Sequence, residues 1–502
     1  MKYGYVIGLD IGTTGCKAAL MDAGGRFYAQ AYREYPVVTG ADTRAEQDAE
    51  NVFSLCKAVI REAVEKSRID TIDAICASVQ GDAIIPLDEN FRPVHAAILG
   101  MDYRPAVLCK EVEDIFPAGF IYQKTGMPIH PINSALKILW LMKNTDMTGT
   151  AHYTTYSDFI NARLTGRLII DETMASRTML YGLETRCWAE AIADKLTIPV
   201  EKLSDVAPSG TPAGPLLPGL CAELGIANRP LVIAGAHDQP ACALGAGLHR
   251  EGMAVDSMGT AEVLSTVFFT PRLSQEMESG SFPCYRHAWP DAYFTFALNH
   301  TSGIILRWFR DTLCGKETGE ARAAGTDFYA YMQKGMQSKP SPILMLPHFN
   351  GRGTPYADSS AKGAFAGITL NTDKKDILKG IMDSLTYELR LNIEYLERSG
   401  IRMDTLRCVG GGSRSPIWLQ SKADILNRRV ETLETSECGC LGAGMLAAYG
   451  AGLHASIPEA VSLMSRVAGV FDPDEKFKAQ YEQKYRAFCK LYDAMSEIDL
   501  ML

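Results

Sequence analysis

Short apolar runs that end in glycine, threonine or aspartate recur along the chain. Residues 3–10 form such a run, and a glycine-rich turn leads from it into a second apolar run over 16–21. This pattern predicts two buried strands joined by a tight turn. Helical periodicity follows over 48–66, and the apolar run at 72–78 predicts a further strand. Strands that alternate with crossover helices are typical of an α/β architecture.

The same order of elements returns in the second half of the chain. Residues 230–238 predict a strand that ends in Gly and Asp, and 239–248 predict a helix of small residues. Residues 253–264 then repeat the order of strand, Gly-Thr turn and strand. At 502 residues the chain is also too long for a single hydrophobic core. We therefore expect two related domains, at residues 1–246 and 247–502.

Composition and charge exclude several classes of protein. Apolar residues at 47% and charged residues at 22% are ordinary values for a globular chain. A net charge of −9 offers no basic stripe for nucleic acid. The sequence shows neither a signal-peptide pattern nor a run of about 18 uncharged apolar residues that would span a membrane. The thirteen cysteines lack the spacing of a disulfide framework, so we expect a cytoplasmic protein without nucleic-acid or membrane partners.

The first candidate site is the turn over residues 10–17 (DIGTTGCK). Its two glycines allow successive backbone amides to point inward, which suits the oxygens of a phosphate. Thr13 and Thr14 add hydroxyl donors, and Lys17 adds a positive charge. Asp10 is placed to hold a magnesium ion through water. An ordinary glycine-rich hairpin turn is the structural alternative.

The second candidate is the carboxylate of Asp238, at the end of the predicted strand 230–238. Phosphoryl transfer requires a protein to position a hydroxyl, accept its proton and neutralise the charge of the phosphate. Asp238 suits the proton-accepting role. The alternative is that Asp238 caps the following helix, where aspartate is common. We interpret His237 as a structural or hydrogen-bonding neighbour of this carboxylate.

A glycine-rich segment at 409–420 (VGGGSRSPIWLQ) is the third candidate. Three glycines that follow an apolar strand and precede a helix form a surface that a flat base or a phosphate can approach closely. The segment is no Walker P-loop, because the Gly-Lys-Ser/Thr sequence of that loop is missing. Alone, it is also compatible with a generic loop.

Polar side chains follow two further apolar strands. Gln80 and Asp82 lie in the segment 78–82, and Asp102 lies in 101–104. A polyhydroxylated ligand needs such side chains, because each hydroxyl that it buries must find a hydrogen-bond partner. Each of the two segments is equally typical of a solvated turn.

The order of these motifs resembles the FGGY family of carbohydrate kinases, within the actin-like ATPase superfamily. The resemblance covers nearly the whole chain. It implies an α/β fold with two ribonuclease H-like domains that flank a catalytic cleft. The sugar would bind mainly to the first domain, and ATP mainly to the second. The motifs that carry the resemblance are the segments 10–14, 102–104, 134–141, 157–166, 235–238, 258–260, 410–415 and 437–444.

The resemblance also implies a role for each candidate residue, with ATP and Mg²⁺ as the cofactors. Asp238 looks like the general base that takes the proton from the attacking hydroxyl, and Asp10 like the residue that holds the metal. The residues expected at ATP are Thr13, Thr14, Lys17, Gly259, Thr260, Gly411, Gly412 and Ser413. The residues expected at the sugar are Gln80, Asp82, Asp102 and Asp238.

Departures from the family pattern bear on the substrate. The family's glycerol kinases read Gln-Arg-Glu where this chain reads Gln80, Gly81 and Asp82, so the missing arginine argues against glycerol. The Met-His pair that is typical of xylulose kinases is missing here too. We expect transfer of the γ-phosphate of ATP to a ketopentose such as xylulose, or to a similar ketose. A polyol kinase for a tetritol or pentitol is the next interpretation.

Two other classes remain as alternatives. A chaperone-type or filament-forming actin-like ATPase would share the phosphate loops, but it lacks Asp238 and the element at 137–140 in this form. A non-catalytic sugar sensor could also be built on this fold, although the intact Asp10 and Asp238 argue against it. Dimers are common in the family, so a homodimer is compatible with the resemblance, but no segment identifies an interface.

Overall fold

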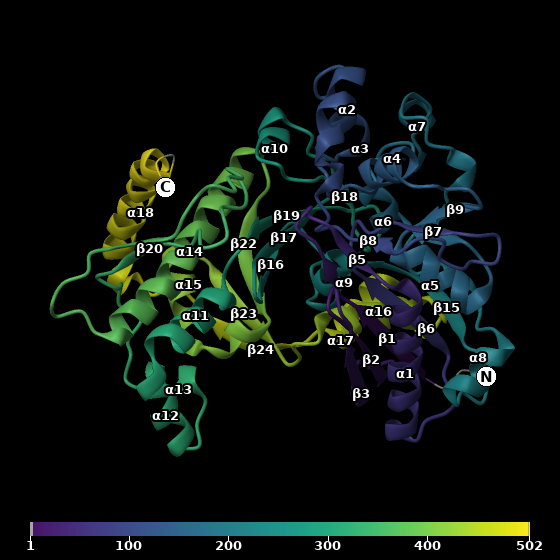
Figure 1. Cartoon of the computed structure of the whole chain (residues 1–502). Helices are drawn as coiled ribbons and strands as arrows, with labels where there is room; N and C mark the ends of the chain where they lie inside the picture. Colours follow the sequence, from purple (N-terminus) through teal and green to yellow (C-terminus); the bar gives the residue numbers. More distant parts are fainter. Residues whose placement is uncertain (1–3, 500, 502) are drawn as a thin grey trace.

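Two β-sheets with the same core strand order form the centre of the molecule (Figure 1). The structure is a computed structural model, and it describes residues 4–499 and Met501. The first sheet has the order β14 (Pro212–Pro215), β15 (Leu231–His237), β6 (Ala74–Val79), β1 (Tyr5–Ile11), β2 (Gly15–Asp22) and β3 (Phe27–Glu34). The second has the order β18 (Tyr285–Arg286), β19 (Tyr293–Asn299), β17 (Glu262–Phe268), β16 (Gly252–Met258), β22 (Met403–Val409), β23 (Arg429–Leu433) and β24 (Val467–Phe471).

Each sheet is built from an antiparallel meander that continues into parallel strands. In the first sheet, β1, β2 and β3 form the meander, and β1, β6 and β15 are parallel. In the second sheet, β16, β17 and β19 form the meander, and β16, β22 and β23 are parallel. This repeated order is the ribonuclease H-like arrangement, and it confirms the predicted α/β fold class.

The local predictions agree closely with the observed elements. The Gly-Thr turns lie between β1 and β2 and between β16 and β17, as predicted; Tyr3, in the first predicted strand, lies outside the described residues. The predicted helix 48–66 is α1 (Ala49–Ser67). Its N-cap Asp48 accepts hydrogen bonds from the amides of Glu50 and Asn51, which satisfies backbone donors at the helix start.

Helix α16 (Cys438–Gly450) belongs to the second half of the chain but packs against the first sheet. In Figure 1 it lies among the purple strands β1 and β2. A Cβ at Gly8 of β1 would lie only 2.0 Å from the carbonyl oxygen of Cys440. The next helix, α17 (Ile457–Met464), joins the same buried cluster, which also contains Val6. The core of the first lobe is therefore completed by a distant part of the chain.

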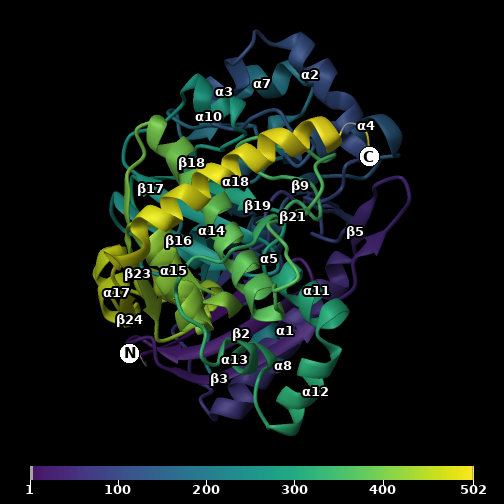
Figure 2. The ribbon, with the colours of Figure 1, turned by 90° about the vertical axis from the view of Figure 1, so that its left-hand side faces the viewer.

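The other helices surround the two sheets. In the first half they are α2 (Cys109–Ile115), α3 (Phe120–Thr125), α4 (Ser134–Asn144), α5 (Tyr156–Thr165), α6 (Glu172–Arg177), α7 (Glu190–Lys195), α8 (Pro218–Leu224) and α9 (Asp238–Gly245). In the second half they are α10 (Gln275–Ser279), α11 (Gly303–Leu313), α12 (Gly315–Ala323), α13 (Phe328–Gln333), α14 (Lys374–Arg398), α15 (Pro416–Leu426) and α18 (Lys478–Asp499). Figure 2 shows α18 crossing the outer face of the second lobe.

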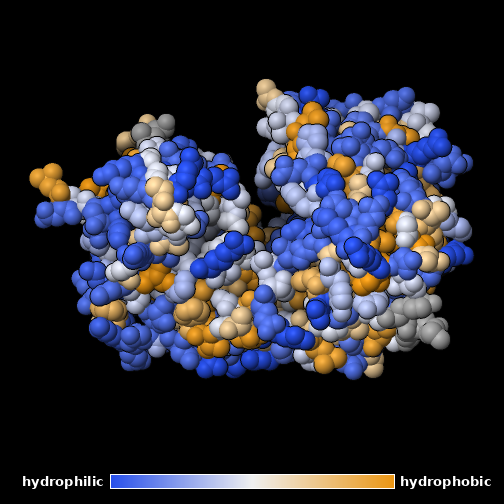
Figure 3. Space-filling view, turned by 90° about the horizontal axis from the view of Figure 1, so that it is seen from below, coloured by the Kyte–Doolittle hydropathy of each residue, from blue (hydrophilic) through white to orange (hydrophobic). Residues whose placement is uncertain are grey.

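Small sheets complete the described elements. They are β4 (Val38–Thr39) with β5 (Ala45–Gln47) and β8 (Ala97–Ile98), β7 (Ile85–Leu87) with β9 (His152–Thr154), β10 (Ile169–Asp171) with β13 (Asp205–Ala207), β11 (Tyr181–Gly182) with β12 (Cys187–Trp188), and β20 (Leu344–Leu346) with β21 (Ala364–Ala366). Among the described residues, none of the helices combines the length and the apolar character needed to cross a membrane. Seen from below, the surface is hollowed between the two lobes (Figure 3).

Candidate active site

Parallel pairing of β1, β6 and β15 brings three parts of the predicted site together. Asp10 lies beside Ser78 in the register of β1 and β6, and Ser78 lies beside Ala236 of β15. The three strands end at the same edge, where β15 leads directly into α9 at Asp238. The sheet thus places the two predicted functional carboxylates, Asp10 and Asp238, at one edge.

Asp10 is a buried carboxylate with an altered proton affinity. Its pKa is raised to about 6, mainly by burial and also by the nearby carboxylates of Asp238 and Glu437. The hydroxyl of Ser78, which donates to Oδ1 at 2.8 Å, and the charge of Lys17 act in the opposite direction. A cation beside Asp10 would relieve this repulsion.

These surroundings fit the predicted role of Asp10 at a magnesium ion. Mg²⁺ commonly binds to proteins through one or two carboxylates, with waters and substrate phosphates as its other ligands. Among the described residues, no group of three or more His, Cys, Asp or Glu side chains is arranged to hold a metal ion.

Lys17 forms an ion pair with Glu437, which precedes α16. Although its partial burial acts to lower the pKa of Lys17, the hydrogen bond and charge of Glu437 raise it. The second half of the chain therefore contributes a charge beside the turn over residues 10–17. Glu437 lies in the motif at 437–444, but no role was predicted for it.

The carboxylate of Asp238 is held by a neighbouring histidine. Nε2 of His237 lies 3.0 Å from Oδ1 of Asp238, and Nδ1 lies 3.1 Å from the hydroxyl of Tyr285. The tyrosine hydroxyl can donate a hydrogen bond to Nδ1 of His237. With Nδ1 as acceptor, the ring carries its proton on Nε2 and can donate it to the carboxylate of Asp238. The side chain of Asp238 is 31% exposed, so it can still meet a ligand.

Gly81 makes room for the His237 ring. A Cβ at position 81 would lie 2.5 Å from Nε2 of His237. No pattern in the sequence connects these two residues, which lie far apart along the chain. Tyr285, on β18 of the second sheet, was also missed, because no local pattern marks it as a partner of a histidine in the first half.

Three of the four predicted sugar contacts, all except Asp238, are buried and already hydrogen-bonded. Asp82 forms a bidentate ion pair with Arg177, at 2.9 and 2.8 Å. Asp102 accepts from the guanidinium of Arg104 and from the amide of Ala45 at 2.9 Å. The side-chain amide of Gln80 donates to Oε1 of Gln47 at 2.9 Å. They form polar walls rather than free surface groups.

Two basic side chains near these walls were not among the predicted site residues. Lys137 is fully buried and donates to the carbonyl of Pro131 at 3.3 Å. Burial lowers its pKa to about 7, and the charges of Asp82 and Asp102 oppose this shift. Burial likewise lowers the pKa of His130 to about 4. Lys137 belongs to the motif at 134–141, but the sequence did not predict its burial near two carboxylates.

The predicted ATP residues lie on two turns of the second lobe and one of the first. Thr14 is exposed, and so are Gly259 and Thr260 between β16 and β17. The amide of Gly303, at the start of α11, donates to the carbonyl of Gly259 at 2.9 Å. The start of α11 therefore adjoins this turn, a placement that the sequence analysis did not predict.

The third glycine-rich segment forms a tight turn before α15. Gly411, Gly412 and Ser413 lie in a short 3-10 helix, η3 (Gly411–Arg414). The hydroxyl of Ser413 donates to the carbonyl of Gly410 at 2.7 Å, so it stabilises the turn itself. The exposed Gly411 leaves the backbone open to a flat ligand.

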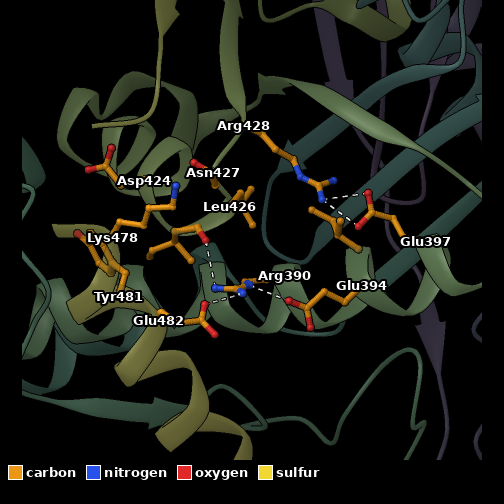
Figure 4. A pocket seen from close by; sticks show the side chains of 12 residues that line it. Arg390, Glu394, Glu397, Asp424, Leu426, Asn427, Arg428, Lys478, Tyr481 and Glu482 are labelled. Atoms are coloured by element: carbon orange, nitrogen blue, oxygen red, sulfur yellow. Dashed lines mark hydrogen bonds and ion pairs between the residues drawn. The ribbon is translucent and has the colours of Figure 1, made fainter. Parts of the chain in front are cut away.

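A cavity of about 280 Å³ lies elsewhere, between α14, the end of α15 and α18 (Figure 4). Its two arginines are both paired. Arg390 contacts Glu394 and Glu482, each at 2.8 Å, and Arg428 contacts Glu397 at 2.9 Å. Both guanidinium groups already have carboxylate partners, and none of the predicted site residues lines this cavity.

Family models of known proteins match both halves of the chain. The N-terminal domain of the FGGY family of carbohydrate kinases matches residues 5–245, and its C-terminal domain matches residues 254–451. The chain belongs to the FGGY family of carbohydrate kinases. It is therefore an ATP-dependent sugar kinase, as the motifs predicted.

Individual relatives of this FGGY kinase carry different substrate names. A xylulose kinase of Bacillus subtilis is 29% identical over 497 residues, which cover 97% of this chain and 96% of the relative. The crystal structure of ligand-bound xylulose kinase from Lactobacillus acidophilus has a TM-score of 0.88 at 26% identity, and gluconate kinase from the same organism has 0.88 at 25%. Both structures cover 98% of either chain. The relatives agree on a sugar kinase and differ in the sugar.

Proposed function

We propose that this FGGY kinase transfers the γ-phosphate of ATP to a hydroxyl of a ketopentose, with xylulose as the first candidate. The observation that carries the proposal is the setting of Asp238, a half-buried carboxylate at the sheet edge beside Asp10 and within contact of His237. The similarity to a xylulose kinase over nearly the whole chain supports the choice of sugar.

In this proposal Asp238 accepts the proton of the attacking hydroxyl. A general base must lie within hydrogen-bond reach of that proton, and the His237 contact orients the carboxylate for it. The walls formed by Asp82 with Arg177 and by Asp102 offer oxygen and nitrogen atoms to the remaining sugar hydroxyls. Because these groups are held by partners on the protein, they would bind the sugar with little reorganisation.

The nucleotide would lie across the junction of the lobes. Thr13, Thr14 and Lys17 would contact its phosphates from the first lobe, and the Gly259–Thr260 turn would contact them from the second. Gly411, Gly412 and Ser413 would lie at the adenosine. A magnesium ion near Asp10 would neutralise phosphate charge when it is bound with ATP. The cytoplasmic location and the homodimer stay predictions.

A substrate screen tests the proposal. The purified protein with magnesium and ATP is assayed for ADP release against xylulose, ribulose, gluconate, glycerol, a tetritol and two pentitols. We expect the highest kcat/KM with a ketopentose. Gluconate is included because a gluconate kinase shares the fold at 25% identity. A clear preference for gluconate or for a polyol would overturn the choice of sugar but leave the kinase activity in place.

A further inference from the structure

Three charged side chains are fully buried beneath the turn between β16 and β17. Nζ of Lys422 lies 2.6 Å from Oδ2 of Asp256 and 2.7 Å from Oε1 of Glu262, and all three side chains have no exposed surface. Burial of a charge is costly unless opposite charges and hydrogen bonds compensate it. This ion triad is therefore held in one geometry.

The triad joins the elements that carry two of the predicted ATP loops. Asp256 lies on β16 and Glu262 on β17, so they flank Gly259 and Thr260. Lys422 lies on α15, the helix that follows the glycine-rich segment at 410–415. A single ammonium group thus ties both strands of the phosphate turn to the helix behind the adenosine loop.

The two loops also touch directly through Met258, the residue before Gly259. A Cβ at Gly412 would lie 2.6 Å from Cε of Met258 and 2.9 Å from Cζ3 of Trp418. At Gly410 it would lie 2.9 Å from the Met258 carbonyl oxygen. The two loops are rich in glycine and have few side chains that could fix their positions. Their relative placement therefore depends on the strands and the helix that carry them.

A hydrogen-bonded chain extends the triad toward α14. Nδ2 of Asn299 donates to Glu262 at 3.2 Å, and Nδ2 of Asn392 donates to Oδ1 of Asn299 at 3.1 Å. The hydroxyl of Thr354 donates to Asn392 at 2.8 Å. Burial raises the pKa of Glu262 to about 7, although Lys422 opposes the shift. The triad is part of a network that spans β19, α14 and α15.

We propose that Lys422 is a positioning residue for ATP, which holds the Gly259–Thr260 turn and the glycine-rich loop in a fixed relation. The inference rests on the proposed ATP contacts of these two loops. The physical reason is preorganisation: loops that are held in the bound geometry lose less conformational entropy when the ligand arrives. Lys422 touches no substrate in this account, and it acts only through the loops.

The test compares two buried lysines of the same lobe. Lys379 is 4% exposed and pairs with Asp383 on α14, where it also contacts Tyr481 of α18 at 3.1 Å. Lys379→Met removes the cation from the buried Asp383, and Lys422→Met removes it from the buried Asp256 and Glu262, so both should lower the melting temperature. Only Lys422→Met should raise the KM for ATP, by about tenfold, the loss typical of groups that support a ligand site from behind. The KM for the sugar should stay within about twofold of the wild-type value.

A milder variant and a measurement made without nucleotide distinguish a positioning role from a general loss of folding. Glu262→Gln keeps the shape of the side chain and should raise the KM for ATP by a smaller factor. Hydrogen exchange without nucleotide should be faster at the amides of 257–263 in both Lys422→Met and Glu262→Gln, but not in Lys379→Met. Unchanged exchange there, or an equal rise in the KM for ATP in Lys379→Met, would overturn the positioning role. Wild-type protein that fails to bind ATP would instead overturn the proposed function.

Discussion

At the scale of single residues, the setting of Asp238 depends on space that a glycine leaves open. In Gly81→Ala the new methyl group would meet the His237 ring, whose Nε2 would lie 2.5 Å away. The ring would have to turn, and the 3.0 Å contact with Asp238 would be lost. We expect kcat to fall by about tenfold or more, because the base loses its orientation. Gly219→Ala is the matched control, since nothing lies within 4 Å of a Cβ there.

His130, near Asp82, should make the stability of the protein depend on pH. Its pKa of about 4 in the folded protein lies below the value near 6.5 of an unfolded chain. Between these values the unfolded chain binds a proton that the folded protein does not, so the free energy of unfolding falls as the pH falls from about 6.5 to 4. His130→Gln removes this contribution. Urea denaturation at pH 7 and pH 5 should show a difference about 2 kcal/mol smaller in the variant than in the wild type, and equal differences would contradict the assignment.

At the scale of elements, the contact of α9 with α16 depends on small residues. A Cβ at Gly442 of α16 would lie 1.9 Å from the carbonyl oxygen of Ala241 on α9. Because backbone cannot move aside cheaply, Gly442→Ala should destabilise the protein by about 1–3 kcal/mol. Gly319→Ala, in α12, meets nothing within 4 Å and should stabilise by about 0.5–1 kcal/mol. Denaturant unfolding measures both, and equal signs would contradict this account of the contact.

At the scale of the whole molecule, the two halves of the sequence are not two separable units. Helices α16 and α17 complete the buried cluster that contains Val6 and Met21 of the first sheet. A fragment of residues 1–246 should therefore lack cooperative unfolding and bind the dye ANS. A fusion of the same fragment to residues 435–466 through a flexible linker should recover a cooperative transition. Cooperative unfolding of the isolated fragment would contradict the role given to α16.

Features that depend on interactions between near neighbours in the sequence could be predicted, and features that depend on distant residues could not. The strands, the Gly-Thr turns and α1 with its cap Asp48 depend on near neighbours, and the local pattern was sufficient for them. The placement of Asp10 and Asp238 at one edge of the sheet follows from the rule that neighbouring parallel strands end at the same edge. Lys17 with Glu437, by contrast, joins residues 420 positions apart, which no local pattern reveals.

The burial of the predicted sugar contacts also could not be read from the local sequence pattern. Asp82 was predicted as a possible ligand contact, but its partner Arg177 lies 95 positions away. Lys137 and Lys422 become buried only when several elements close around them, so their low exposure follows from the tertiary structure. The sequence therefore indicated candidate loops, but it did not indicate the buried charged groups that lie behind them.

The most direct test of the central claim is the steady-state turnover of Asp238→Asn with the best sugar from the screen. The variant keeps the size of the side chain but cannot accept the proton. We predict that kcat falls by about 10²- to 10⁴-fold, while ATP binding and the melting temperature stay at wild-type values. Asp404→Asn, at an exposed aspartate of β22, should retain full activity. A folded Asp238→Asn enzyme that turns over at near wild-type rate would contradict the assignment of Asp238 as the base.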